Sequence, residues 1–529
     1  MGPFLTSHWP SKRLSCELME LDRRVCDRAR RSRDPRFDGK FFIAVTSTRI
    51  YCRPICPARA PKDENIRYYA TAAAAHSAGF RPCLRCRPEA SPGTPAWHGT
   101  SSVVSRGLRL ITDGALDRQG VDALADRLGV TARHLRRLFL QHLGATPIDV
   151  ALTRRVHFAK KLLDETHLPM SQVAFAAGFG SLRRFNGEMR RVYSRTPSQL
   201  RRLARKRPIG RSGYRFRIAY RPPYDWNAII GFLGARATPG VEQVDRDRYQ
   251  RTISIDGHHG TIGVSPAADG PALILDVDLS DSRALLLIVE RVRRMFDVAA
   301  DPAMIANQLS DDALLEESLA AHPGIRMPGA WDPFEIAVRA ILGQQISVAA
   351  ATTIAGRIAA RWGTAIEAAN GLTRLFPTAA QLANAPLEEA GITSARAGTL
   401  RALARAVIDG TLSFDGVSTA AQLHAIPGIG DWTAQYVLMR ALNEPDAFLS
   451  GDLVLKRMAG GCTALELDRR SQPWRPWRAY AVMLLWQSAR DLDEHQRRIR
   501  HAHVETHHHR HSSHAGGRAG GHPERAARR

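Results

Sequence analysis

The chain has no long hydrophobic run. Nothing in its 529 residues approaches the roughly 18–20 consecutive apolar residues that a membrane-spanning helix needs. The opening residues, MGPFLTSHWPSKRL, lack the apolar segment of a secretory signal. Cysteine is also scarce, with seven residues, which excludes a disulfide-rich scaffold. Together these absences predict a cytoplasmic protein with no membrane partner.

Acidic residues are outnumbered by basic ones mainly in the first 210 residues. The formal net charge is +24; it is +9 over residues 1–100, +13 over residues 101–210, −1 over residues 211–490 and +3 over residues 491–529. A chain of this length exceeds a single hydrophobic core, so we expect about three or four domains. The concentrated positive charge indicates that the first 210 residues bind nucleic acid. The alternative is charge that only keeps the protein in solution.

Residues 89–102 are rich in proline, glycine and serine, and residues 205–213 are basic and contain proline and glycine. Both stretches are predicted to be linkers. Between them apolar residues recur at helical spacing. After the second linker the pattern alternates as in β-strands, in YRFRIAY, TISIDG, GTIGV and ALILDVDL, and helical spacing returns over residues 282–490. The histidine- and arginine-rich end, residues 493–529, is predicted to be disordered.

Four of the seven cysteines lie close together in the sequence: Cys52 and Cys56 in YCRPIC, and Cys83 and Cys86 in RPCLRC. A Cys-x3-Cys pair followed by a Cys-x2-Cys pair suits four thiolate ligands on one Zn²⁺ ion. A small domain with little hydrophobic core gains folding free energy from such a metal. The spacing therefore predicts a zinc site rather than four unrelated thiols.

The residues around this cluster, from FDGKFFIAV to RPCLRC, resemble the N-terminal domain of the Ada-type alkylation-response proteins. The resemblance implies that Cys52 irreversibly accepts a methyl group from a DNA methylphosphotriester; the alternative is a purely structural zinc site. Zinc keeps a thiolate deprotonated and therefore nucleophilic. Methylation removes one negative charge, which weakens repulsion from phosphate and tightens DNA binding. Arg59 and Arg81 are candidate phosphate contacts, or ordinary solvated arginines.

Residues 121–147, VDALADRLGVTARHLRRLFLQHLGATP, have the pattern of a helix-turn-helix with its turn at Gly129. A second copy begins at Met170 and turns at residues 178–181. The pair, with GFGSLRRFN and RTPSQLR, resembles the AraC-type DNA-binding domain. The resemblance implies binding to two neighbouring major-groove segments of a promoter and a partnership with RNA polymerase. The candidate contacts to bases or phosphates are Arg136, Arg137, Arg183 and Arg184.

The stretch IPGIGDWTAQY, residues 426–436, places several turn-forming residues before a helical run. Such glycines fit a nucleotide-cofactor loop, a grip on a DNA phosphate, or a plain turn. A dinucleotide fold would need a preceding strand, whereas STAAQLHA is helical. The stretch resembles the helix-hairpin-helix of base-excision DNA glycosylases. That resemblance implies DNA contacts at Gly428, Gly430 and Thr433, and a monovalent cation on the hairpin carbonyls.

Further segments resemble AlkA-type 3-methyladenine DNA glycosylases: PPYDWNAIIGFLGARA, RAILGQQISVAAA, AFLSGDLVLKRM and WRPWRAYAVMLLW. The resemblance implies that Asp452 is the catalytic aspartate, offsetting charge on an oxocarbenium-like sugar or orienting water; a helix N-cap is the alternative. Aromatic faces bind electron-poor cationic bases, so Trp486, Tyr436 and Trp432 are candidate pocket walls, or core residues. Gln345 stands where some of these enzymes insert leucine beside the flipped base.

Three absences narrow the chemistry. Relatives that also cleave the DNA backbone carry a hairpin lysine as a Schiff-base nucleophile, but Trp432 occupies that position here, which favours a glycosylase without lyase activity. Cys462 stands alone, so no four-cysteine iron–sulfur cluster follows the hairpin. No Pro-Cys-His-Arg motif occurs, so direct repair of O6-methylguanine is not expected.

We therefore predict a multidomain, monomeric, nucleoid-associated protein. It would unite a methylphosphotriester acceptor, a transcriptional activator and a monofunctional glycosylase acting on alkylated bases in double-stranded DNA. The alternative is a zinc-dependent transcription regulator with a catalytically degenerate glycosylase-like module. The predicted parts are a small zinc-bound α/β domain (20–90), an all-α tandem helix-turn-helix domain (100–205), an α+β glycosylase made of an antiparallel β-sheet subdomain (212–295) and a helical helix-hairpin-helix subdomain (296–492), and the tail (493–529).

Overall fold

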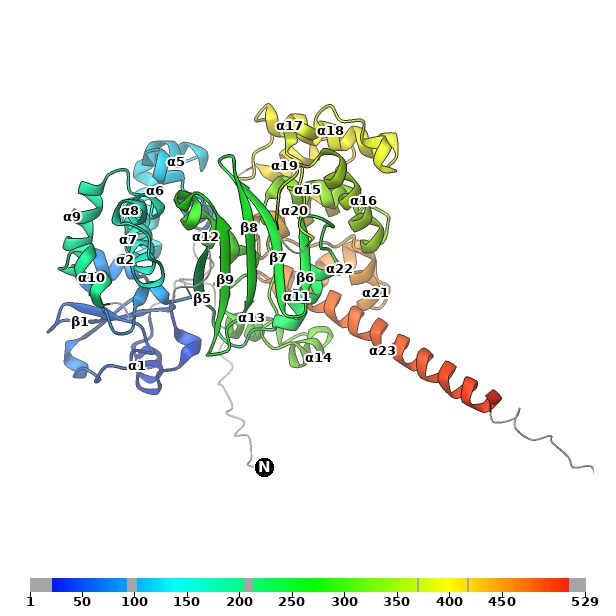
Figure 1. Cartoon of the computed structure of the whole chain (residues 1–529). Coiled ribbons are helices and arrows are strands. Elements are labelled where there is room, and N and C mark those ends of the chain that lie inside the picture. The colour runs from blue at the N-terminus through cyan, green and yellow to red at the C-terminus, as the bar shows by residue number, and fades with distance from the viewer. Residues whose placement is uncertain (1–20, 93–101, 204–212, 369–370, 416–417, 513–529) are drawn as a thin grey trace, which may run out of the picture.

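The structure is a computed structural model that describes residues 21–92, 102–203, 213–368, 371–415 and 418–512. Most of each predicted linker lies outside these residues. Figure 1 shows the first two hundred residues gathered on one side of a central sheet, and most of the helices of the second half on the other. None of the helices in the described part of the chain combines the length and apolarity that a membrane crossing requires.

The zinc-site domain is a four-stranded sheet of order β3-β1-β2-β4 with helices packed beside it. Strands β1 to β3 pair antiparallel, and β4 pairs parallel with β2. Two small apolar clusters fill the two faces of the sheet. The elements are α1 (Arg23–Ser32), β1 (Phe42–Val45), β2 (Ile50–Cys52), β3 (Ile66–Tyr69), α2 (Ala72–Ser77) and β4 (Arg81–Pro82).

Eight helices follow, arranged as two helix-turn-helix pairs around a long central helix, α7. Helix α7 begins with a capping box in which Thr146 and Asp149 each accept the other's backbone N–H. The pairs are α5–α6 and α8–α9. The helices are α3 (Ser102–Thr112), α4 (Ala115–Arg118), α5 (Val121–Arg127), α6 (Ala132–Leu143), α7 (Pro147–Glu165), α8 (Met170–Ala176), α9 (Leu182–Tyr193) and α10 (Pro197–Leu203).

The central sheet is five-stranded, antiparallel throughout, and ordered β5-β9-β8-β7-β6. Alternating sequence predicts four of its strands, but not the short edge strand β6, because Glu-Gln-Val-Asp carries no apolar alternation. The elements are β5 (Tyr214–Ala219), α11 (Trp226–Gly234), β6 (Glu242–Asp245), β7 (Arg248–Ile255), β8 (His258–Pro266), β9 (Ala272–Leu279) and α12 (Leu285–Met295).

The remaining helices form one layered body in which α15 is almost wholly buried and packs against α20. His322 joins three parts of this body, because its ring nitrogens lie 2.8 Å from Asp225 Oδ2 and 2.7 Å from Asp491 Oδ2. The helices are α13 (Pro302–Leu309), α14 (Ala313–Ala321), α15 (Pro333–Leu342), α16 (Val348–Trp362), α17 (Ala379–Leu382), α18 (Ser394–Ile408), α19 (Thr419–His424), α20 (Asp431–Leu442), α21 (Leu453–Met458), α22 (Ala464–Arg470) and α23 (Arg478–Ser512).

Residues 493–512, which the sequence assigns to a disordered tail, belong to helix α23 in the structure. The helix continues to Ser512 and projects away from the body (Figure 1). Extending a helix that is already nucleated in the core needs no new nucleation, and no glycine or proline interrupts residues 493–512. Residues 513–529 of the predicted tail lie outside the described residues.

Helix α7 connects the zinc-site domain to the central sheet, where Lys161 Nζ donates to the Arg217 carbonyl of β5 at 2.5 Å. Tyr51, next to Cys52 on β2, has its hydroxyl 2.8 Å from Nε2 of His157 on α7. Arg87 pairs with Asp164 of α7 at 2.8 Å. Burial lowers the pKa of His157 to about 3, so its imidazole is neutral at physiological pH. The two N-terminal domains therefore share a polar, ion-paired interface.

Candidate active site and metal centre

A cleft of about 1380 Å³ opens between the end of α11 and the helical body. It is lined by the end of α11, by α15, the loop after it and α16, and by the hairpin, α20, α21 and α23. The residues that the sequence assigns to base excision meet here from segments more than 100 positions apart: Gln345, Gly428, Gly430, Trp432, Thr433, Tyr436, Asp452 and Trp486.

Asp452 lies at the cleft and also caps α21. Its Oδ1 accepts the backbone N–H groups of Val454 and Leu455, both at 3.0 Å. Trp432 Nε1 donates to Oδ2 at 2.9 Å, and Trp486 Nε1 donates to Oδ1 at 3.3 Å. The N-cap interpretation and the active-site interpretation are therefore both compatible with its position. Four N–H donors fix the direction of the carboxylate.

Aromatic rings form one wall of the cleft beside this carboxylate. The rings of Trp432 and Tyr436 stack with their centroids 5.2 Å apart, and Tyr436 lies 6.3 Å from Trp486. A fourth ring, Phe232 of α11, stacks on Trp486 at 6.2 Å. Sequence reasoning did not select Phe232, because nothing in the spacing of α11 indicates that it reaches a helix 250 residues away.

Three arginines lie near Tyr436 of this wall. Arg440 Nη1 donates to the Tyr436 hydroxyl at 2.8 Å, and the charges of Arg236 and Arg339 also act on it. Burial alone would raise the pKa of Tyr436, but Arg440, Arg236 and Arg339 outweigh burial and lower it. Tyr436 of the cleft wall therefore lies among three arginines, a feature that the sequence pattern did not predict.

The predicted hairpin joins α19 to α20 at the rim of the cleft. Gly428 has φ +89°, and a Cβ there would lie 2.2 Å from the hydroxyl oxygen of Thr399 on α18. Gly430 caps α20 without a side-chain hydrogen bond, and a Cβ there would meet nothing within 4 Å. The exposed N-terminus of α20 therefore leaves backbone N–H groups open to an approaching phosphate.

Thr433 is only 2 % exposed, and its hydroxyl oxygen accepts the Gln344 side-chain N–H at 2.9 Å. Gln344 also donates to the Gly428 carbonyl at 3.0 Å. The sequence pattern did not single out Gln344, although it directly precedes Gln345 in the segment RAILGQQISVAAA. Gln345 itself is exposed, lines the cleft and has φ +57°. Gln344 thus ties the loop that carries Gln345 to the hairpin.

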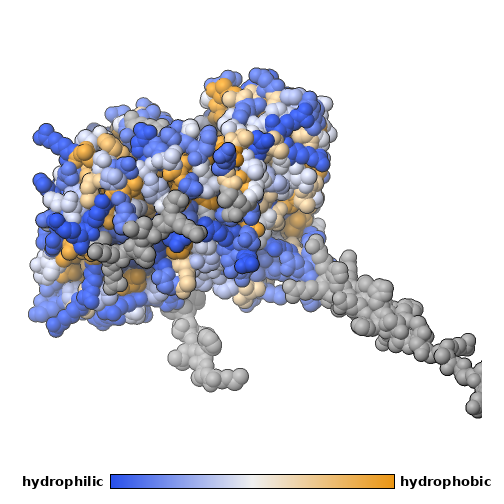
Figure 2. Space-filling view, in the orientation of Figure 1, coloured by the Kyte–Doolittle hydropathy of each residue, from blue (hydrophilic) through white to orange (hydrophobic). Residues whose placement is uncertain are grey.

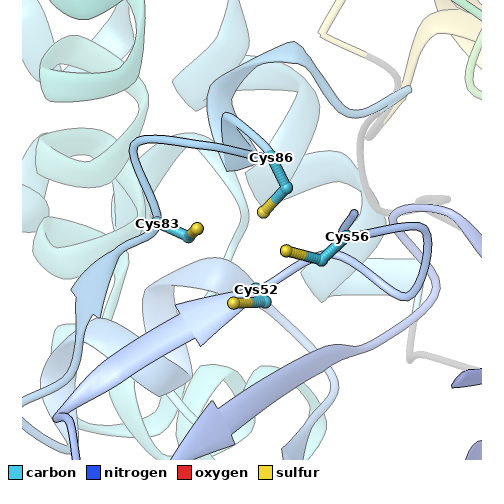
Figure 3. A group of neighbouring side chains, drawn as sticks. All are labelled: Cys52, Cys56, Cys83 and Cys86. Atoms are coloured by element: carbon cyan, nitrogen blue, oxygen red, sulfur yellow. The ribbon is translucent and has the colours of Figure 1, made fainter. Parts of the chain in front are cut away.

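The four clustered cysteines converge as the spacing predicts (Figure 3). Their sulfur atoms all lie within 4.8 Å of one another. Zn–S bonds of about 2.3 Å in a tetrahedron would place the sulfurs about 3.8 Å apart, so these residues fit one four-coordinate Zn²⁺. Cys52 and Cys56 are half-buried, whereas Cys83 and Cys86 are buried. No second group of converging metal ligands occurs among the described residues.

The predicted DNA-contacting arginines of the N-terminal half lie mainly at the surface. Those on α6 and α9 are exposed, as is Arg59, whereas Arg81 on β4 is half-buried. Figure 2 shows hydrophilic side chains across much of the visible face of this half. Their positions are compatible with nucleic-acid contact, and their roles stay predictions.

Four parts of the chain match known protein families. Residues 25–89 match the metal binding domain of Ada, and residues 124–203 match a helix-turn-helix domain. Residues 215–332 match the AlkA N-terminal domain, and residues 338–476 match the HhH-GPD superfamily of base excision DNA repair proteins. The predicted fold classes and the zinc site are confirmed by these matches and by the cysteine cluster.

Known relatives cover both halves. A "Probable bifunctional transcriptional activator/DNA repair enzyme AlkA" of Mycobacterium tuberculosis is 42% identical over 482 residues, covering 88% of this chain and 97% of the relative. The "DNA-3-methyladenine glycosylase 2" of Escherichia coli is 33% identical over 51% of this chain and 96% of the relative. The "Bifunctional transcriptional activator/DNA repair enzyme Ada" of Escherichia coli is 40% identical over 22% of this chain and 31% of the relative. The chain therefore belongs to the family of bifunctional transcriptional activator/DNA repair enzymes, in which Ada-type zinc and helix-turn-helix domains precede an AlkA-type glycosylase.

Proposed function

We propose that the C-terminal half hydrolyses the N-glycosidic bond of alkylated bases such as 3-methyladenine in double-stranded DNA. The observation that carries this proposal is the orientation of Asp452, whose carboxylate is held by two backbone N–H groups and by two indoles of the cleft wall. A carboxylate fixed in this way needs no rearrangement when positive charge develops on a nearby sugar.

The cleft walls support base flipping into this site. N-alkylated purines are cationic and electron-poor, so the faces of Trp432, Tyr436 and Trp486 would stack on the flipped base. As the bond between C1′ and the base nitrogen breaks, its electron pair leaves with the base. Asp452 offsets the resulting charge on the sugar or orients the water that attacks C1′. Because Trp432 replaces a hairpin lysine, we expect no strand cleavage.

The hairpin and the loop after α15 would hold the duplex around the flipped nucleotide. Gly428 and Gly430 present backbone N–H groups to a phosphate, and hairpin carbonyls would take a monovalent cation. Gln345 would fill the gap that the flipped base leaves in the stack. Gln344 hydrogen-bonds to Gly428 and Thr433, so it joins the loop that carries Gln345 to the hairpin. This connection supports the proposal that the loop and the hairpin hold the DNA together.

We propose that Cys52 accepts methyl groups from DNA methylphosphotriesters. Zinc held by Cys52, Cys56, Cys83 and Cys86 would keep the thiolates deprotonated at neutral pH. Cys52 Sγ attacks the methyl carbon, the methyl carbon–oxygen bond breaks, and the phosphodiester leaves with the bonding electrons. Exposure favours the half-buried Cys52 and Cys56 over the buried Cys83 and Cys86, and the choice of Cys52 between these two rests on the resemblance to the Ada-type domain. Arg59 and Arg81 would contact the phosphate.

The resulting loss of negative charge would strengthen binding of the helix-turn-helix pairs to promoter DNA and, with RNA polymerase, activate transcription. The candidate contacts remain Arg136 and Arg137 on α6, and Arg183 and Arg184 on α9. This division assigns residues 20–90 to methyl acceptance, 100–205 to promoter binding and 212–492 to base excision. We expect a monomer associated with the nucleoid.

Base release tests the enzymatic half. The full-length protein is incubated with a duplex that carries one 3-methyladenine or 7-methylguanine, and the free base and strand breaks are measured. Release of the base without strand breaks is expected. No release above that from an undamaged duplex would instead support the alternative of a DNA-binding regulator with a degenerate glycosylase-like module.

Methyl transfer tests the other half. DNA whose methylphosphotriesters carry a labelled methyl group is incubated with the wild type, with Cys52→Ser and with Cys462→Ser, a matched control outside the cysteine cluster. Label is expected on the wild type and on Cys462→Ser but not on Cys52→Ser. Transfer to Cys52→Ser at the wild-type level would overturn the assignment of the acceptor.

A further inference from the structure

Helix α7 covers the outer edge of β5 and joins the regulatory half of the chain (residues 21–203) to the glycosylase half (residues 213–512). β5 stands at the end of the five-stranded sheet, so one of its edges has no described strand to pair with. At that edge Arg217 N donates to Glu165 Oε2 at 3.3 Å, and the Arg217 carbonyl accepts from Lys161 Nζ. Both backbone groups of Arg217 are therefore satisfied by α7, whereas a bare edge strand would expose such groups to other chains.

Apolar packing continues across the same boundary. The second helix-turn-helix pair, α8–α9, shares one cluster of buried side chains with the central sheet and α12, whereas the first pair has a cluster of its own. Helix α8 packs against the short helix Ser282–Ala284 that precedes α12. The buried rings of Phe158 on α7 and Phe216 on β5 lie 6.0 Å apart. The core of the second pair is therefore continuous with the core of the glycosylase half.

Charged groups of the regulatory half also reach into the glycosylase half. Lys40 of the zinc-site domain pairs with Asp301, the N-cap of α13, and only 10 % and 1 % of these two side chains are exposed. Arg109 of α3 donates to the Leu442 carbonyl at the end of α20 at 3.0 Å, and also to the Asp415 carbonyl. A buried charge that loses its partner is strongly destabilising. Separation of the halves would therefore leave costly unpaired groups on both sides.

We propose that the two halves form one cooperative folding unit, in which the regulatory half is a structural part of the base-excision enzyme. Domains joined only by a linker unfold independently of each other. Here the edge contacts of α7, the shared apolar core and the buried charges are all lost when either half unfolds. Loss of structure in the regulatory half is therefore expected to unfold the cleft as well. Zinc thereby stabilises the cleft, although its four ligands lie in another domain.

Two probes report the two halves separately. Of the nine tryptophans in the chain, Trp9 and Trp97 lie outside the described residues, and the other seven lie between Trp226 and Trp486 in the glycosylase half. In a full-length background that carries Trp9→Phe and Trp97→Phe, tryptophan fluorescence follows urea unfolding of the glycosylase half. Release of zinc to a colorimetric dye follows the zinc-site domain. A single cooperative unit gives coincident transitions, and neither probe depends on the proposed activities.

Lys160 and Lys161 offer a matched pair of substitutions on α7, because both are buried and both pair with the carboxylate four residues further along. The ion pairs of Lys160 are with Asp164 and Glu89, inside the regulatory half. Lys160→Met is nevertheless expected to lower both midpoints equally, by at least about 0.5 M urea. The double variant Lys40→Met/Lys161→Met removes two buried cations from the interface, so its transitions should separate, with zinc release first.

Removal of zinc from the background protein with EDTA needs no lysine substitution, and it decides the question if a lysine variant fails to fold. The tryptophan midpoint should then fall by at least about 0.5 M urea. Separate transitions in the background protein overturn the inference, as does a tryptophan midpoint that is unchanged by Lys160→Met or by zinc removal. Transitions that stay coincident in Lys40→Met/Lys161→Met overturn the assignment of the coupling to this interface.

Discussion

Asp452→Asn separates the helix-capping role of this residue from its proposed chemical role. Asparagine caps helices about as well as aspartate, so the oxygen that accepts from Val454 and Leu455 can be kept. The amide nitrogen would then face Trp432 Nε1–H in place of Oδ2, and one indole donor would lose its acceptor. We expect a loss of about 1–3 kcal/mol in the free energy of unfolding.

The effect of Asp452→Asn on the rate of base release should be larger than its effect on stability. Asp452 is 9 % exposed beside a cleft that solvent enters, which suits an effective dielectric constant of about 20. A unit charge about 4 Å from the developing sugar cation then contributes about 4 kcal/mol, because the Coulomb energy scales as 332/(εr). Removing it should slow release of 7-methylguanine about 1000-fold in single turnover.

Asp312 provides a matched control. It caps α14 by accepting from Leu314 N at 2.9 Å, and its Oδ2 accepts from Trp474 Nε1 at 2.9 Å, as Asp452 does from Trp432. It also pairs with Arg470 at 2.8 Å, and it does not line the cleft. Asp312→Asn should therefore lower the melting temperature at least as much as Asp452→Asn, while base release stays within about twofold. The reasoning is refuted if Asp452→Asn retains a tenth of wild-type activity, or if the two variants lose activity equally.

Three other perturbations test separate parts of the structure. Gly428→Ala should lower the free energy of unfolding by about 1–3 kcal/mol and weaken binding to undamaged duplex, because φ is +89° and the new Cβ would meet Thr399. Gly430→Ala should change stability little in thermal unfolding. Equal losses of stability in the two variants would contradict this reasoning. Chelation of zinc should make residues 21–92 sensitive to limited proteolysis, because two small apolar clusters cannot stabilise the sheet without metal, and unchanged resistance would argue against a structural contribution. Burial lowers the pKa of His322, but hydrogen bonds to two carboxylates outweigh burial and raise it; its stabilisation is therefore present below the ordinary histidine pKa and lost as pH rises through the raised value. Melting curves of wild type and His322→Gln should converge over that rise, and a gap that stays constant would refute the linkage.

Local sequence patterns predict most of the secondary structure, and where they mispredict an element the cause is visible in that element. Alternation identified β5, β7, β8 and β9, but the polar edge strand β6 shows no such pattern and depends on pairing with β7. At the other end, composition suggested disorder, yet α23 continues to Ser512, because a helix started in the core can propagate through residues that would not begin one.

The sequence by itself determined the parts of this protein whose chemistry lies in short segments: the zinc ligands, the two helix-turn-helix pairs, and the hairpin with Asp452 beyond it. Cysteine spacing and turn-forming residues are properties of segments a few residues long, so they can be recognised without knowing the tertiary structure. Only the tertiary structure decided that Asp452 is held by two indoles at once, that Gln344 ties the Gln345 loop to the hairpin, and that Phe232 and Arg236 of the sheet subdomain complete the cleft. These contacts join residues up to 250 positions apart, and side-chain hydrogen bonds and ring stacking at such separations depend on how the layers pack rather than on any local pattern.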